Sequence, residues 1–117
     1  MKWCLSAFLL CSLAGFANEL ANAGFEDGDG TIPAAWRVHS GRPVRDTDHS
    51  RTGTASVKLV SAGPEDGMGL KQVIEYDEPD TRPIVVGGWS RAEGVDSTGD
   101  YSVYLDIFHA DGTPWWG

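Results

Sequence analysis

The sequence predicts an all-β protein, an antiparallel β-sandwich of the jelly-roll type. Three observations favour this class. Apolar and polar residues alternate over short segments, turn residues separate the segments, and no amphipathic helical pattern is longer than two turns. The fifteen glycines and six prolines follow no period, which indicates frequent turns. Short strands without intervening helices are typical of antiparallel sandwiches.

Seven segments are expected to form strands, and they lie at 20–25, 36–38, 43–46, 55–60, 70–76, 84–92 and 101–108. The clearest alternation runs from Tyr101 to Phe108, where every second side chain packs on the same face. Trp115 and Trp116 begin a further strand that no partner strand follows. The sandwich is therefore expected to lack its closing strands.

The first seventeen residues have the pattern of a secretory signal peptide. Lys2 supplies a positive charge, an almost unbroken apolar run follows, and Gly15 and Ala17 are small residues before the expected cleavage point. An apolar run of about a dozen residues is too short to cross a bilayer of about 30 Å as a helix. We expect a signal peptide over 1–17, one sandwich domain over 18–117, and a secreted or periplasmic location. A buried N-terminal strand or helix is the alternative.

Charge and cysteine content limit the partners of the exported chain. Cys4 and Cys11 both lie in the predicted signal peptide, so the exported chain would hold no disulfide. Removal of Lys2 leaves eight basic and seventeen acidic residues, a net charge of −9. Such a surface repels nucleic acid and anionic lipid, so we expect neither nucleic acid nor, after cleavage, a membrane as partner. The sequence makes no prediction of the oligomeric state.

The opening of the exported chain has an interpretable local pattern. Gly24 and Gly28 can adopt positive φ around a tight corner. Phe25 and Trp36 are large enough to anchor a small core.

Residues 22–28 and 32–36 resemble the "N-x-G-F-E-x-G … P-x-x-W" opening of secreted carbohydrate-binding modules of the family four, nine and twenty-two group. The similarity continues in the same order through 49–53, 55–59, 72–73, 88–92, 104–107 and 111–113. It implies a galactose-binding-domain-like jelly roll that binds a polysaccharide or oligosaccharide without catalysis, as part of a larger glycan-degrading protein. A structural or adhesion domain that binds a protein partner is the alternative.

Sugar binding needs a flat aromatic face with polar side chains beside it. Trp89 is the best candidate for the platform, because alternation turns Trp89 and Arg91 to the same face of their strand. Gln72, Tyr104 and Asp106 are expected on neighbouring strands of the same sheet, where they would donate or accept hydrogen bonds. The alternative is that Trp89 fills the core and that Tyr104 is an ordinary surface residue.

The acidic opening also raises the question of calcium. An EF-hand starting at Asp27 would need Gly and Glu where Ile32 and Val38 stand, so this motif is excluded. The resemblance instead implies a structural Ca²⁺ bound by Glu26, with Asp46 or Asp48 and carbonyl oxygens of 49–53. A solvated acidic loop is the alternative.

Catalysis has little support in the sequence, and we expect the chain not to be an enzyme. A glycosidase needs two carboxylates placed across the scissile bond in a cleft, and no pair is marked out by its surroundings. The chain also has no nucleophile elbow and no phosphate-binding loop. His39, His49 and His109 lack zinc-like spacing.

Overall fold

The computed structural model describes residues 5–6, 19–63, 65–78, 82–95 and 102–116. Within these ranges the chain forms eight short strands and no helix. The strands are β1 (Leu5–Ser6), β2 (Arg37–Ser40), β3 (Val44–Asp46), β4 (Ser56–Lys58), β5 (Gly69–Lys71), β6 (Trp89–Ser90), β7 (Asp106–Phe108) and β8 (Pro114–Trp116). The all-β class predicted from the sequence is confirmed.

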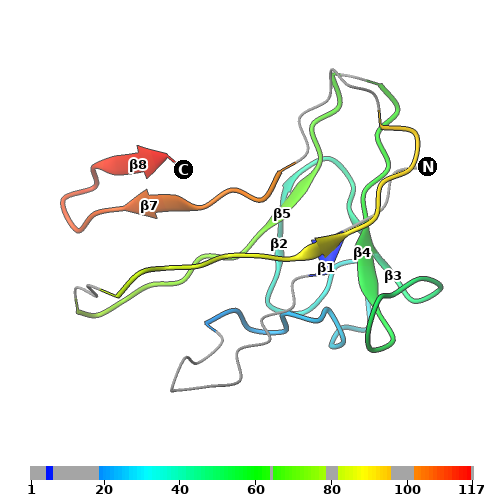
Figure 1. The fold of residues 1–117 in the computed structure, drawn as a ribbon, viewed down its shortest axis with the longest axis horizontal. Helices are drawn as coiled ribbons and strands as arrows, with labels where there is room; N and C mark the ends of the chain where they lie inside the picture. The colour runs from blue at the N-terminus through cyan, green and yellow to red at the C-terminus, as the bar shows by residue number, and fades with distance from the viewer. Residues whose placement is uncertain (1–4, 7–18, 64, 79–81, 96–101, 117) are drawn as a thin grey trace.

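The strands pair as four separate two-stranded antiparallel sheets, β1–β6, β2–β5, β3–β4 and β7–β8 (Figure 1). β2 and β5 pair with Val38 opposite Leu70, and the register shifts before Ser40. β3 and β4 pair with Arg45 opposite Val57. Antiparallel pairing is therefore confirmed among the described residues, and the sandwich and its jelly-roll topology stay predictions.

Most strands are shorter than the sequence predicts. β2 to β5 lie within or beside four of the expected segments, while β6 covers only two residues of 84–92 and β7 only the last three of 101–108. Tyr101 lies outside the described residues. Each described strand pairs with a single neighbouring strand. Its hydrogen-bonded ladder therefore ends where the two paired segments move apart.

The predicted first strand, 20–25, is wrong. Residues 21–24 form a turn, in which the Phe25 N–H donates to the Asn22 carbonyl oxygen at 3.0 Å. Asn side chains favour such turns because they bond to nearby backbone groups in place of a ladder partner.

β1 belongs to the segment that the sequence predicts to be a signal peptide. It pairs with β6, with Leu5 opposite Ser90 and Ser6 opposite Trp89. The part of the chain that the structure describes contains no helix with the length and hydrophobicity needed to cross a membrane.

The core lies where the opening loop covers β3–β4. Phe25 is 1% exposed and Val57 2% exposed. The ring centroids of Phe25 and Trp36 are 5.0 Å apart with the planes tilted by 54°, and Leu59 and Leu70 also pack against this cluster. The prediction that Phe25 and Trp36 are core residues is confirmed.

Asn22 organises the opening loop. Its side-chain Nδ2 donates to the carbonyl oxygens of Asp27 and Ala34, both at 2.9 Å, and its Oδ1 accepts from the Asp27 N–H at 3.0 Å. Its own carbonyl oxygen accepts from the indole Nε1 of Trp36 at 3.0 Å. The loop and the core aromatic are thus held by one residue.

Positive φ occurs in this loop, but only partly where the sequence predicts it. Gly28 has φ of 143°, as expected, whereas Gly24 does not adopt a positive φ. The left-handed non-glycine positions are instead Asn22 at 49°, Phe25 at 61° and Ala35 at 68°. Asn tolerates this region better than most residues, and packing in the core holds Phe25 there.

Candidate functional site

Trp89 lies on β6 with 50% of its surface exposed. The alternative that it fills the core is therefore not what the structure shows. The guanidinium of Arg51 covers part of the ring, with its Cζ 3.5 Å from the ring centroid. A cation at this distance is attracted by the π face.

Arg51 is not among the residues that the sequence predicts to bind a sugar. Arg51 lies in the exposed loop between β3 and β4, and 38 positions separate it from Trp89. Nothing in the local pattern indicates that this loop reaches β6. Only the tertiary fold brings the two side chains together.

Gln72 follows β5 and has mainly a structural role. Its Nε2 donates to the carbonyl oxygens of Ala21 and Ala35, and its Oε1 accepts from the Ala21 N–H at 2.8 Å. The amide has then used both donors and one of its two lone pairs. A ligand could use only the remaining lone pair of Oε1.

A pocket of about 340 Å³ adjoins this amide, and its lining residues are Ala35, Arg37, Gln72, Val73 and Glu75. It combines one cation, one carboxylate and apolar surface. The pocket lies between the start of β2 with the residue two positions before it and the chain just after β5.

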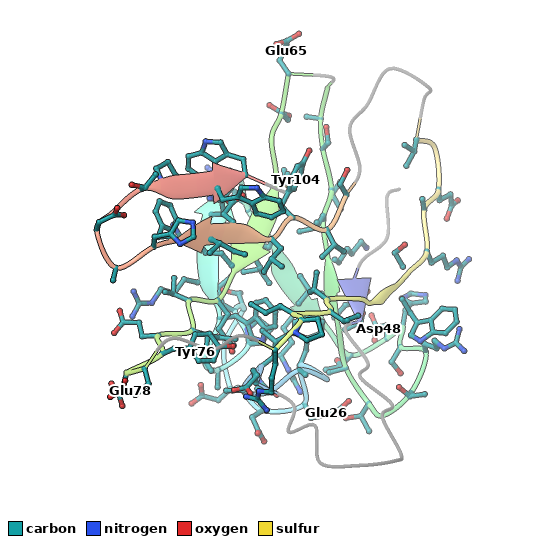
Figure 2. The ribbon with its side chains drawn as sticks, turned by 60° about the vertical axis from the view of Figure 1, so that its left-hand side comes forward. Glu26, Asp48, Glu65, Tyr76, Glu78 and Tyr104 are labelled. Carbon is teal, nitrogen blue, oxygen red and sulfur yellow. The ribbon has the colours of Figure 1, made fainter. Side chains whose placement is uncertain are left out.

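The remaining predicted sugar-site residues are dispersed. Arg91 directly follows β6, Tyr104 precedes β7 and is 60% exposed, and Asp106 lies on β7 opposite Trp116. Figure 2 shows Tyr104 beside the β7–β8 hairpin, well away from Asp48, whose loop also carries Arg51. The expected single sheet is thus replaced by three pairs, β1–β6, β2–β5 and β7–β8.

A second group of exposed aromatic rings lies on the β7–β8 hairpin. Phe108 and Trp116 are in edge-to-face contact, with centroids 5.5 Å apart and planes at 88°. Trp115, opposite Ile107, is more than half exposed. The hairpin projects from the rest of the described chain (Figure 1).

Glu26 joins the opening loop to the start of β4. Its carboxylate accepts from the Thr54 hydroxyl at 2.7 Å and from the Thr54 N–H at 3.0 Å. These bonds from the Thr54 side chain and backbone lower the pKa of Glu26, and the nearby charge of Arg45 acts in the same direction. Gly53 has φ of 68° and leaves no room for a side chain beside the Glu26 carboxylate.

Arg45 supplies the positive charge of this region. Its Nε donates to the Phe25 carbonyl oxygen at 2.8 Å, and its Nη2 donates to the Glu26 carbonyl oxygen at 2.6 Å. The guanidinium therefore donates hydrogen bonds to two backbone carbonyl oxygens of the opening motif, those of Phe25 and Glu26.

Asp46, at the end of β3, has a buried carboxylate with its own partners. Burial raises its pKa, but hydrogen bonds from the Asp48 N–H at 2.8 Å and from His49 outweigh this effect and lower the pKa overall. The His49 Nδ1 lies 3.3 Å from Asp46 Oδ2. The His49 carbonyl oxygen accepts from the Ser56 hydroxyl, so the loop is internally bonded.

The predicted calcium ligands Glu26 and Asp46 both have hydrogen-bond partners within the protein. Among the described residues no group of three acidic, histidine or cysteine side chains is placed to hold a metal ion. The Glu26 carboxylate accepts a hydrogen bond from the Thr54 hydroxyl, and the Asp46 carboxylate is bonded to the Asp48 N–H and to the His49 ring. Figure 2 shows Glu26 and Asp48 at separate points. The expected set contains only two carboxylates, with carbonyl oxygens of 49–53 as the other ligands, so calcium binding by these residues stays a prediction.

The Glu26→Gln variant is expected to lose about 1 kcal/mol of stability at pH 7, because charge-assisted bonds from Thr54 become neutral ones at an exposed site. A lowered folded-state pKa stabilises the fold above the ordinary glutamate pKa of about 4.3 and loses that contribution as pH falls below it. Thermal melts from pH 7 to pH 3 should show the difference from wild type shrinking. A constant difference would exclude a role for the charge.

The same melts, repeated with millimolar calcium and with chelator, test the metal prediction. Calcium bound only by the folded state raises the melting temperature by mass action, and Glu26→Gln should abolish that rise.

A comparison with models of protein families, with curated proteins and with solved structures found no match to this chain.

Proposed function

We propose that the chain is an exported, non-catalytic carbohydrate-binding module whose platform is Trp89. The observation that carries the proposal is the half-exposed indole of Trp89, with Arg51 in contact with its ring. Cleavage of the predicted signal peptide would remove β1, the strand that pairs with β6, so the proposal rests on the contact with Arg51 and not on that pairing. An exposed indole offers the flat apolar surface on which the C–H face of a pyranose stacks. The resemblance of the opening motif and the predicted signal peptide agree with this function and with an extracytoplasmic location.

A second candidate function is a structural or adhesion domain that binds a protein partner. The exposed rings of Phe108, Trp115 and Trp116 on the β7–β8 hairpin favour it, because exposed clusters of aromatic side chains are common at protein interfaces. Glycan binding that depends on Trp89 supports the first proposal, and its absence together with protein binding through the hairpin supports the second.

The Trp89→Ala variant is expected to bind polysaccharide at least about tenfold more weakly than wild type, since the lost stacking contributes about 1–3 kcal/mol. Affinity gel electrophoresis over a panel of soluble polysaccharides measures this loss. Gln72→Ala should weaken binding less and instead lower the melting temperature, because its amide holds the Ala21 backbone.

Trp115→Ala is the control, since it removes an equally large and similarly exposed indole from a different sheet. It should leave the affinity unchanged. If Trp115→Ala removes binding and Trp89→Ala does not, the platform lies on the hairpin and the assignment of Trp89 is wrong.

A further inference from the structure

The loop between β3 and β4 presents Arg51 to the indole of Trp89. Both residues are exposed, and the Cζ atom of the guanidinium lies 3.5 Å from the ring centroid. Among the described residues no ion pair joins Arg51 to a carboxylate. The contact with the π face is therefore what holds this side chain against β6.

A stacked sugar needs the place that the guanidinium occupies. The carbon atoms of a pyranose lie about 3.5–4 Å from the ring atoms on which they stack, the usual distance of van der Waals contact. The Cζ atom of Arg51 lies at that same distance from the ring centroid of Trp89. The saccharide and Arg51 consequently exclude each other from this face of the indole.

The Arg51 side chain can leave the ring without a movement of its loop, because hydrogen bonds hold the loop on both sides of the arginine. The Ser50 hydroxyl donates to the Gly53 carbonyl oxygen at 3.0 Å and so closes the loop around Arg51. Further along, the Thr54 hydroxyl donates to the Glu26 carboxylate at 2.7 Å. Rotation about the bonds of the arginine side chain is then sufficient to uncover the indole. The cost is the loss of the cation–π contact.

We propose that Arg51 is a competitor for the saccharide platform that is built into the protein. It covers the Trp89 indole in the free protein, and a saccharide stacks on that face only after the arginine side chain has turned away. The inference rests on the proposed function, whose platform is the same indole. A cation–π contact at an exposed site favours the covered state over the open state by about two- to fivefold. Because only the open state binds, the contact weakens the apparent affinity by about three- to sixfold.

The test measures the binding of three neutral polysaccharides, mixed-linkage β-glucan, xylan and galactomannan, by affinity gel electrophoresis. Arg51→Ala should bind the polymer that wild type prefers about three- to sixfold more tightly than wild type does. The double variant Arg51→Ala/Trp89→Ala should bind no better than Trp89→Ala alone, because Arg51 acts only through the indole. The polymers are neutral because the loss of a positive charge from a chain with a net charge of −8 would itself change the binding of a charged one.

Arg42→Ala is the matched control, because it removes the same side chain from an exposed position between β2 and β3. It should leave the affinity unchanged, and melting curves should show that each variant is folded. If Arg51→Ala binds like wild type or more weakly, or if Arg42→Ala tightens binding as much, the inference is wrong, whereas a loss of binding in Trp89→Ala still supports the platform. If neither wild type nor Arg51→Ala binds these polymers or any other glycan, the proposed function itself fails.

Discussion

Phe25→Ala is expected to destabilise the protein by about 3–5 kcal/mol, the range for removal of a fully buried aromatic ring. Phe25 is 1% exposed and packs against Trp36 and Val57, which are central to the only core cluster of the described residues. Typical domains have a total stability of about 5–15 kcal/mol, and a core this small places the protein near the lower limit. The variant should therefore be largely unfolded at physiological temperature.

Urea denaturation followed by circular dichroism measures this loss directly. Phe108→Ala is the matched control, because it removes the same ring from a position that is 64% exposed on β7. We expect it to cost no more than about 1 kcal/mol, the value of its edge-to-face contact with Trp116. Equal losses for the two variants would contradict a core centred on Phe25.

The opening motif shows what the sequence can predict and where it fails. The core positions of Phe25 and Trp36 and the positive φ of Gly28 could be predicted from residue type. Few residues are large enough to anchor a core, and few adopt a positive φ easily. The 20–25 strand was wrong because the apolar pattern ignores the Asn22 side chain, which closes a turn on the backbone. Local polar bonds of this kind compete with ladder pairing and leave no trace in hydrophobic periodicity.

The candidate site was predicted less completely than the core. The sequence left Trp89 open between an exposed platform and a core residue, and the structure places it exposed on a segment where Val85 and Val86 are exposed as well. Three features of the site join segments that are far apart in the chain. They are the pairing of β6 with β1, the hydrogen bonds of the Gln72 amide to backbone groups, and the contact of Arg51 with Trp89. Such contacts depend on tertiary placement, which residue spacing within one segment does not encode.

The loss of the Asn22 side chain is expected to have the second largest effect on stability. Asn22→Ala removes three hydrogen bonds that connect the turn to Asp27 and Ala34, and leaves one backbone donor and two acceptors to water. It also places a Cβ-bearing residue with no compensating side-chain bond at φ of 49°, a region that costs about 1 kcal/mol or more. Because the loop is partly solvated, we expect a total loss of about 2–3 kcal/mol.

Two further substitutions separate the backbone contribution from the hydrogen bonds. Asn22→Gly accommodates the positive φ without strain, so it should be about 1 kcal/mol more stable than Asn22→Ala although it lacks the same bonds. Asn22→Asp keeps the acceptor for the Asp27 N–H but loses both donors, and it should also be less stable than wild type. Urea denaturation of the four proteins measures each step, and near-ultraviolet circular dichroism reports the environment of Trp36, whose Nε1 donates to the Asn22 carbonyl oxygen. If Asn22→Ala unfolds at the same urea concentration as wild type, the hydrogen-bonded turn does not organise the opening of this fold, and the core must hold Trp36 without it.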